Sequence, residues 1–352
     1  MNSPASMIDF GRRTWRIRRG PVAVHGALRT VVVCLGLLLV TCAVGVAGVV
    51  TGDLDFTIAE VWRALRDPDA GFDRVVILEW RVPRVTAAIV FGAALGASGA
   101  VFQALTRNPL ASPDVIGLSA GSHTGGLVAI ILLGGTYSAI AGGALIGGVL
   151  TAVAIYLLAY RRGVQGFRLI VVGIGVSAML TAANTYLILR AELDLAMSAA
   201  AWGAGSLNGT NWEQVLIGGG VIVVLLTVLT VFAPALSQLG LGDEAAAASG
   251  VTVERTRLTL VVLGVAPVAV VTAAAGPIAF VALAAPQIAR RLARTAGVTI
   301  TPAAFTGAFL LLAADYAAQH LLPVTLPVGL VTVVIGGGYL VWLLVAEARR
   351  RL

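Results

Sequence analysis

The sequence predicts an all-α protein that crosses a membrane many times. Of its 352 residues, 58% are hydrophobic and 12% are charged, and the mean hydropathy is +0.95, which lies far outside the range of soluble domains. Apolar stretches of about 20 residues, long enough to cross a hydrocarbon core of about 30 Å as helix, recur along the chain. We therefore expect one helical membrane domain over 28–352, preceded by a short N-terminal segment, 1–27.

Ten apolar stretches are expected to form membrane spans. They lie at 28–50, 85–105, 114–133, 138–160, 168–189, 214–234, 257–275, 278–293, 303–322 and 327–346. The eighth stretch is short, which predicts a tilted or broken helix.

Arginines set the expected orientation of these spans. An arginine-rich segment at 12–19 precedes the first span, which is too long for the apolar region of a cleaved signal peptide and is expected to be a retained anchor. With the N-terminus inside and an even number of spans, the arginine-bearing loops at 161–162, 255–257, 290–294 and 349–351 also lie inside, together with the C-terminus. The acid-rich loop 53–79 then lies outside. The net charge of +7 is thus a sign of topology and not of nucleic-acid binding.

Several classes of chemistry are excluded by residues that the chain lacks. It contains no lysine, and a phosphate-binding P-loop needs one, so no Walker-type ATPase resides in this chain. Its two cysteines, Cys34 and Cys42, sit among apolar residues of the first span, and its three histidines have no companions at ligand spacing. We therefore assign no catalytic residue, metal or cofactor.

One buried carboxylate leaves an alternative source of energy open. Asp315 lies well inside a predicted span, and Asp114 lies near the mouth of another. An ion-coupled secondary transporter would need such ionisable groups inside the membrane. A structural acid that is hydrogen-bonded to a neighbouring helix is the favoured interpretation of Asp315, because a single carboxylate is thin support for a proton path.

The segment 79–121 carries the most specific pattern, "EWRVPRVTAAIVFGAALGASGAVFQALTRNPLASPDVIGLSAG". It resembles the FecCD family of ABC-importer permeases, which carry iron–siderophore complexes, haem and cobalamin across the bacterial cytoplasmic membrane. The matching positions are Arg81, Pro83, Arg84, Gly92, Leu95, Ser98, Gly99, Gln103, Asn108, Pro109, Leu110, Ala111, Pro113, Gly117 and Gly121.

The resemblance covers all but about the first 50 residues. It continues through the segments 202–212, 239–257, 276–292 and 310–344, the last of which contains Asp315. Within the family the likeness is strongest to permeases of the ferric-enterobactin type, through "EWR", "FRLIVVGIGVSAML", "AGSLNG" and "GVTVERTRL". Three positions depart from the commoner family pattern: Gln287, Gln319 and Thr325 stand where histidine, arginine and glutamate are usual.

The resemblance implies roles for several groups of residues. Arg81 and Arg84 would receive acidic side chains of an external binding protein, although headgroup anchoring or pairing with Glu79 is the alternative. A polar segment at about 238–257 would be the coupling element that contacts the ATPase, with a plain solvated loop as the alternative. Its expected contact residues are Leu241, Gly242, Asp243, Glu244, Ala248 and Gly250. Gly173, Gly175 and Asn184 are expected along the translocation path, and Gln103, Asn108, Pro109 and Pro113 are expected to be structural.

The resemblance also implies an assembly and a location. The chain would dimerise, with a related but different permease subunit, in the bacterial cytoplasmic membrane. Two ATP-binding subunits, which hold ATP and magnesium, would serve it inside, and one siderophore-binding protein would serve it outside. An inverted internal repeat is implied by the family alone. A haem or cobalamin importer of the same architecture remains open, because residues alone do not identify the solute.

Overall fold

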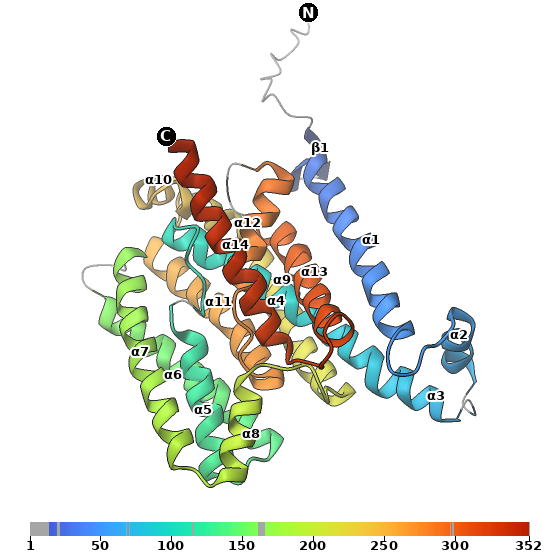
Figure 1. The fold of residues 1–352 in the computed structure, drawn as a ribbon. Helices are drawn as coiled ribbons and strands as arrows, with labels where there is room; N and C mark the ends of the chain where they lie inside the picture. Colours follow the sequence, from blue (N-terminus) through green and yellow to red (C-terminus); the bar gives the residue numbers. More distant parts are fainter. Residues whose placement is uncertain are drawn as a thin grey trace, which may run out of the picture.

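The computed structural model describes residues 14–351 except 20–21, 68, 70, 115, 161–165, 296 and 298. Helices dominate this part of the chain (Figure 1). In order the elements are β1 (Thr14–Arg19), β2 (Val22–Ala27), α1 (Leu28–Val50), α2 (Ile58–Arg66), α3 (Gly71–Val75), η1 (Val76–Arg81), α4 (Val82–Thr106), α5 (Leu118–Leu132), α6 (Tyr137–Ala159), α7 (Gly166–Arg190), α8 (Leu193–Gly203), α9 (Trp212–Leu241), α10 (Asp243–Ala248), α11 (Val253–Ala275), α12 (Val281–Ala293), α13 (Ile300–His320) and α14 (Val328–Arg351).

The prediction of a polytopic all-α protein is confirmed. Each of the ten predicted spans coincides with a helix among the described residues, and seven helical stretches are long and apolar enough to cross a membrane. Two further helices, α5 and the first part of α14, are apolar but shorter. The predicted short eighth span is α12, whose 13 residues extend about 20 Å and fall short of a hydrocarbon core of about 30 Å.

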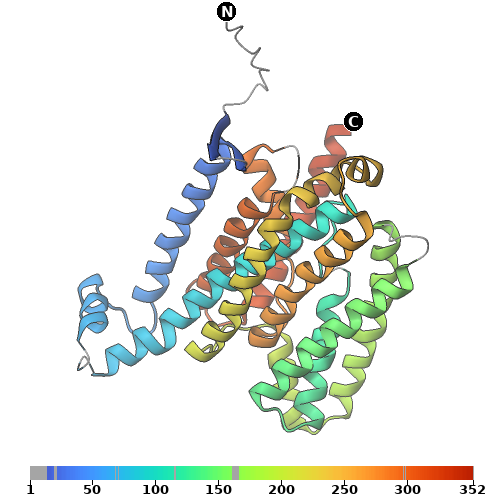
Figure 2. The ribbon, with the colours of Figure 1, turned by 180° about the vertical axis from the view of Figure 1, so that it is seen from behind.

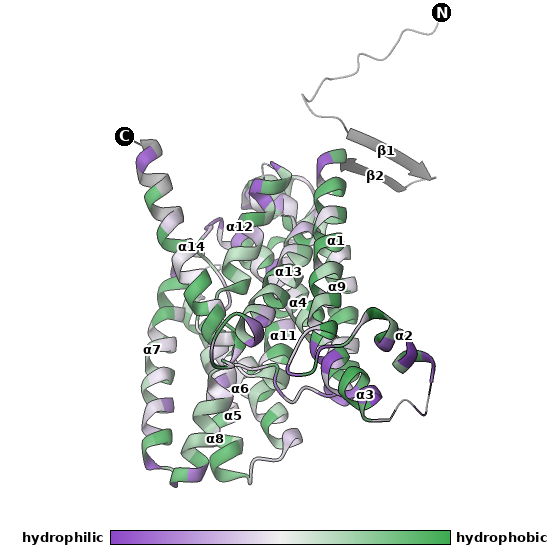
Figure 3. Ribbon diagram, turned by 45° about the vertical axis from the view of Figure 1, so that its right-hand side comes forward, coloured by the Kyte–Doolittle hydropathy of each residue, from purple (hydrophilic) through white to green (hydrophobic). Residues whose placement is uncertain are grey.

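Polar and apolar residues separate along the bundle as a membrane requires. Figure 3 shows hydrophobic colouring along the flanks of the helices and hydrophilic colouring mainly towards the two ends. We call the end where α10 and the end of α14 lie the α10 face, and the end where α8 lies the α8 face (Figure 1).

Helix α4 lies at the centre of the bundle and contacts α9, α11, α12 and α13 (Figure 2). Its glycines allow this packing. A Cβ atom on Gly99 would overlap the carbonyl oxygen of Ala282 on α12, and one on Gly96 would overlap that of Ala303 on α13. Close approach of helix backbones supplies the dispersion contacts that stabilise helix pairs in lipid, where no hydrophobic driving force acts between them. The glycine-rich motif of α4 is thus a packing surface.

The start of the second predicted span is corrected by the structure. The helix does not begin at residue 85 but runs back through η1 and α3 to Gly71, giving 36 helical residues. Pro83 does not begin this helix, although proline is typical of a first helical turn. Here the helix widens before the proline, and the backbone amide of Val82 donates to the carbonyl of Ile77, five residues back. Such a π-turn accommodates an irregularity without ending the helix.

Two irregular segments that interrupt the helices meet one another. The first joins α4 to α5 and the second joins α11 to α12. The backbone amide of Phe280, which has a φ of +67° and caps α12, donates to Oδ2 of Asp114 at 2.8 Å. A carboxylate at this place satisfies an amide that the helix itself leaves free. Asp114 is therefore a helix cap between two distant segments.

The N-terminal segment 1–27 contains secondary structure that the sequence did not suggest. Strands β1 and β2 form an antiparallel hairpin in which Thr14 pairs with Ala27 and Arg19 with Val22. The hairpin leads directly into α1. The expected arginine loop at Arg161 and Arg162 lies outside the described residues.

Candidate functional site

The α8 face contains a polar cleft of about 360 Å³ between the end of α1, the start of α4 and the end of α13. Arg81, Arg84 and Asp315 line it, together with Gln319 and Thr325. The structure therefore brings both arginines predicted to dock a binding protein, the buried carboxylate and two of the three unusual positions into one site.

Arg84 and Asp315 form a two-pronged ion pair across this cleft. Nε of Arg84 donates to Oδ2 of Asp315 at 2.8 Å, and Nη2 donates to Oδ1 at 2.7 Å. The side chains are 20% and 6% exposed, so the pair is largely shielded from water. This geometry is the strongest that arginine makes with a carboxylate. Asp315 thus ties α13 to α4, which is the contact expected of a structural acid that is hydrogen-bonded to a neighbouring helix.

Arg81 is held by carbonyl oxygens at the end of α1. Its Nη1 donates to the carbonyl of Val49 at 2.8 Å and to that of Val50 at 3.3 Å, while Nη2 donates to the carbonyl of Leu54 at 2.6 Å. The guanidinium also lies over the ring of Phe56. The last carbonyls of a helix have no partner within the helix. Arg81 supplies hydrogen-bond donors to these carbonyls and fixes the turn that follows α1. In the described part of the chain, no ion pair joins Arg81 or Arg84 to Glu79.

A histidine closes the same cleft on its α13 side. The ring of His320 stacks on that of Tyr316 with centroids 4.4 Å apart, and its Nε2 lies 3.1 Å from the carbonyl oxygen of Thr51 at the end of α1. Gln319, one position before, donates to Asn208 at 3.4 Å. The end of α13 is therefore held by hydrogen bonds to the end of α1 and to Asn208, and these contacts fix the wall of the cleft.

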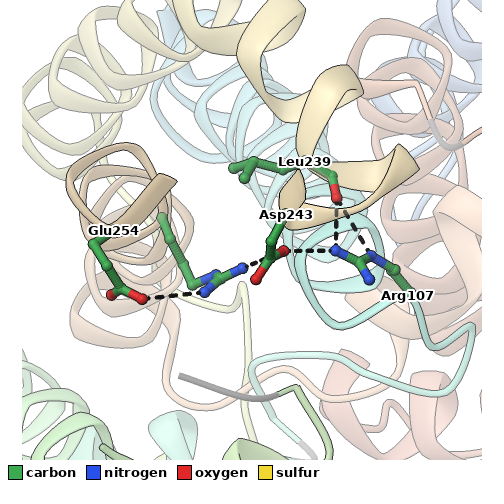
Figure 4. Close-up of polar contacts among 5 residues, drawn as sticks. Arg107, Leu239, Asp243 and Glu254 are labelled. Carbon is green, nitrogen blue, oxygen red and sulfur yellow. Dashed lines mark hydrogen bonds and ion pairs between the residues drawn. The ribbon is translucent and has the colours of Figure 1, made fainter. Parts of the chain in front are cut away.

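The α10 face holds a second polar cluster, at the predicted coupling segment (Figure 4). Oδ1 of Asp243, the first residue of α10, accepts hydrogen bonds from Nη2 of Arg107 at 2.7 Å and from Nη2 of Arg257 at 2.8 Å. Arg107 follows α4 and also donates to the carbonyl of Leu239 at the end of α9. Arg257 on α11 is only 9% exposed and lies 3.5 Å from Glu254. Asp243 thus ties α10 to both α4 and α11.

The charge state of Asp243 follows from these contacts. The hydrogen bond from Arg257 lowers the pKa of Asp243 below its ordinary value of 3.8. Partial burial opposes this shift, and the charges of Arg257 and Arg107 act with the hydrogen bond. A depressed pKa stabilises the fold at pH values above the unfolded pKa, and this contribution is lost as the pH falls through the folded pKa. Asp243 is therefore ionised at neutral pH.

The other residues of the coupling segment divide into buried and exposed sets. Ala246 is fully buried against the bundle, whereas Leu241 is 74% exposed and Glu244 and Ala248 are exposed as well. Gly242 and Gly250 bound α10 with φ values of +131° and +83°, which disfavour other residues. The segment therefore exposes Leu241 at the end of α9, and Glu244 and Ala248 on the short helix α10.

The α10 face also contains a cleft, of about 510 Å³, which lies between α4, α9 and α12. At its base the buried amide of Gln287 donates to Gln103, and Gln103 donates to the carbonyl of Leu283 at 3.0 Å. Asn108 forms a turn with its side chain, which accepts from the amide of Leu110 at 2.9 Å. Gln103, Asn108, Pro109 and Gln287 are thus brought together as structural residues, and Pro113 accepts from the amide that opens α5.

Helix α7 carries the residues predicted along the translocation path, and they differ in their surroundings. A Cβ atom on Gly173 would overlap the carbonyl oxygen of Ile116, so this glycine allows the α4–α5 connection to pack on α7. Gly175 has open space beside it. Asn184 is buried, and its Oδ1 has no hydrogen-bond partner among the described residues. Nearby, a shallow hollow is lined by serine, threonine and alanine side chains of this helix.

Reasoning from the sequence missed two arginines that hold the predicted coupling segment. Arg107 and Arg257 were not assigned roles, although they ionically fix the predicted coupling segment. Arg257 lies fourteen residues after Asp243 in the predicted cytoplasmic loop, which was a usable signal. Arg107 lies 136 residues before Asp243, and nothing in the local sequence indicates that contact. Among the described residues, no group of three or more histidine, cysteine, aspartate or glutamate side chains is arranged to hold a metal ion.

Comparison with known proteins assigns this arrangement to a family of transporters. Residues 33–346 match the FecCD transport family. The chain is 45% identical over 329 residues to the ferric enterobactin transport system permease protein FepG of Escherichia coli, and the match covers 93% of this chain and 100% of that protein. It is 36% identical over 319 residues to the achromobactin transport system permease protein CbrC of Dickeya dadantii, covering 90% and 91%.

A solved structure agrees with the fold. An inward-facing metal-chelate type ABC transporter has a TM-score of 0.78 and 25% sequence identity to this chain, over 90% of this chain and 99% of that one. The fold is therefore that of an ABC-transporter permease. By sequence, length and architecture together, the chain belongs to the FecCD transport family.

Proposed function

We propose that this chain is the permease subunit of an ABC importer that carries a ferric siderophore, of the catecholate type, into the cytoplasm. The observation that carries the proposal is the 45% identity to a ferric enterobactin permease over that protein's whole length. The alternative of an ion-coupled secondary transporter loses its main support, because Asp315 is occupied by Arg84.

The proposed importer contains further subunits. They are a second, different permease chain of the same family, two copies of an ATP-binding subunit and one extracytoplasmic binding protein. The absence of lysine supports a separate ATPase, since ATP and magnesium are held by a P-loop that this chain lacks. The siderophore crosses at the interface of the two permease subunits, and this chain performs no covalent chemistry.

In this proposal the α10 face is cytoplasmic and the α8 face is external. The distribution of arginine supports this orientation, because Arg107, Arg257, Arg290 and Arg349 all belong to segments at the α10 face. The chain is then a multi-pass protein of the bacterial inner membrane, and both of its termini lie in the cytoplasm.

The external cleft is the proposed docking site for the binding protein. Arg81 and Arg84 are already engaged within the chain, but a guanidinium has five N–H donors, and Arg84 uses only Nε and Nη2 on Asp315. Its remaining N–H groups have no acceptor among the described residues and can donate to a carboxylate from outside. The internal contacts hold both guanidiniums in place, which lowers the entropy lost on docking.

The coupling segment is proposed to contact the ATPase through its exposed residues. Leu241, Glu244 and Ala248 form the contact, while Gly242 and Gly250 set the shape of the segment. Asp243 acts inside the chain: through Arg107 and Arg257 it transmits a displacement of α10 to α4 and α11. Closure of the ATPases on ATP then rocks the bundle around the solute path.

The solute path is proposed to run along the exposed face of α7. Gly175 and the small polar side chains around Ser177 and Thr181 leave room for a bulky solute. Asn184 is buried, and its Oδ1 has no hydrogen-bond partner among the described residues, so it lies beside this path and not on its exposed face. Gly173 shapes the path indirectly, because it seats the segment that precedes α5.

Reconstitution tests the proposal. The chain is incorporated into proteoliposomes with its co-purified partner subunits. Uptake of radio-iron is measured with ferric enterobactin or haem, and uptake of radio-cobalt with cobalamin, each with the matching binding protein. We expect ATP-dependent uptake of the ferric catecholate. ATP-dependent uptake of haem or cobalamin, without uptake of ferric enterobactin, would refute the siderophore as solute but would still identify the complex as an ABC importer. Uptake without ATP, driven by a pH gradient, would refute the class itself.

A further inference from the structure

Helix α2 is amphipathic, and part of its apolar surface has no partner among the described residues. Its exposed apolar side chains are Ile58, Trp62 and Leu65, which are 72%, 56% and 52% exposed. Their spacing of four and three residues places them on one side of a helix. Exposed apolar patches of this kind mark an interaction surface.

The helix is divided into three adjoining sectors. Ala64, which is 1% exposed, and Val61 pack against the bundle. The exposed apolar stripe comes next around the helix, at about 100° per residue. Glu60, Arg63 and Arg66 occupy the remaining arc. A helix whose sectors face protein, lipid and water in turn is suited to lie at a membrane surface beside the bundle.

The depth of α2 follows from its contacts with α1. Ala64 and Val61 of α2 share a hydrophobic cluster with Val49 in the last turn of α1. Helix α1 has 23 residues, about 35 Å at 1.5 Å per residue, so it exceeds a hydrocarbon core of about 30 Å by little. Its last turn therefore lies at the membrane–water interface, and α2 lies at the same level.

Helix α1, which precedes α2, also exposes apolar side chains. Leu35, Leu39 and Val46 of α1 are 54%, 71% and 54% exposed, as a lipid-covered helix requires. Only residues 51–57 separate the end of α1 from the start of α2.

The side chains at the edge of the stripe fit a headgroup region. The guanidinium of Arg66 lies 4.2 Å from the centroid of the Trp62 ring, which puts a cation and an amphipathic ring at the boundary of the apolar and polar sectors. Tryptophan concentrates at membrane interfaces, and arginine reaches phosphate from there. A capping box at Thr57 and Glu60 fixes the start of the helix, so the stripe is pre-formed.

From these observations we infer that α2 is an interfacial helix that lies in the headgroup region of the bilayer, with Ile58, Trp62 and Leu65 in the acyl boundary and Arg63 and Arg66 towards phosphate. The occupant of the stripe is lipid. The helix anchors the connection between α1 and α4, and with it the rim of the external cleft.

Site-directed fluorescence tests this inference in the full-length chain with its co-purified partners in lipid nanodiscs. In a background in which Cys34 and Cys42 are replaced by alanine, single cysteines at Leu65→Cys and Ile58→Cys carry an environment-sensitive fluorophore. Arg63→Cys on the polar sector is the matched control. All three side chains are exposed, so none of the changes opens a cavity, and gel filtration checks folding.

We expect blue-shifted emission at 58 and 65, and quenching there by lipid with a shallow doxyl group about threefold stronger than at 63, as for a helix immersed about 5–10 Å. A doxyl group at the end of the acyl chain should quench less than the shallow one. Equal quenching at 65 and 63, with the 65 probe open to aqueous iodide, would overturn the inference. Blue-shifted emission at 65 that needs added binding protein would also overturn it and make that protein the occupant.

Discussion

Removing one partner of the Arg84–Asp315 ion pair is expected to destabilise the protein far more than removing both. The pair is two-pronged, and its side chains are 20% and 6% exposed. Asp315→Ala leaves a guanidinium in a shielded site without its counter-charge, for which we expect a loss of about 3–5 kcal/mol in the free energy of unfolding. Replacing both partners, with Arg84→Met and Asp315→Leu, should cost about 1 kcal/mol, because no unpaired charge remains.

The assay is unfolding of the purified chain in mixed micelles with rising dodecyl sulfate, followed by tryptophan fluorescence. Glu79→Ala is the matched control, because it removes an exposed carboxylate from the same region, and it should change the free energy by about 0.5 kcal/mol or less. Additive effects of the two single substitutions, or a wild-type unfolding curve for Asp315→Ala, would refute the assignment of Asp315 as the tie between α4 and α13.

Three further predictions concern other parts of the bundle. Asp243→Asn should lower the free energy of unfolding by only about 1 kcal/mol, since half of the Asp243 side chain is exposed. Because the pKa of Asp243 is depressed, this difference from wild type should persist above about pH 4 and vanish as the pH falls further. A difference that stays unchanged in acid would contradict the prediction. Leu241→Arg, at an exposed position, should leave the unfolding midpoint unchanged while abolishing the stimulation of ATPase activity by loaded binding protein, and intact stimulation would refute the contact. Gly99→Val should cost about 3 kcal/mol or more in the same unfolding assay, because its Cβ overlaps a backbone carbonyl, whereas Gly175→Val, with open space beside it, should leave stability nearly unchanged.

Much of the fold could be predicted from hydropathy alone. Each apolar stretch of about twenty residues became a helix, because a helix satisfies every backbone group of a segment within that segment, as lipid requires. The helix of the second span extends back past Pro83, whose missing amide is tolerated by a widened turn as well as by a helix start. No periodicity distinguishes these two outcomes.

The sites were harder to predict because their partners lie far apart in the chain. Arg84 and Asp315 are 231 residues apart. From the neighbouring sequence alone, Glu79 was the acid expected to pair with the arginines. The glycines show the same limit: Gly173 and Gly175 look alike in sequence, but only Gly173 seats another backbone. The resemblance to FecCD permeases identified the segments that matter, and the contacts within them required the structure.

The central claim is that this chain imports a ferric catecholate with energy from a partner ATPase. The most direct measurement is uptake of radio-iron from ferric enterobactin into proteoliposomes that contain the full complex, with and without ATP and with and without a protonophore. We predict uptake that requires ATP and the binding protein and is unaffected by the protonophore. Uptake that proceeds without ATP and collapses on addition of the protonophore would contradict the claim.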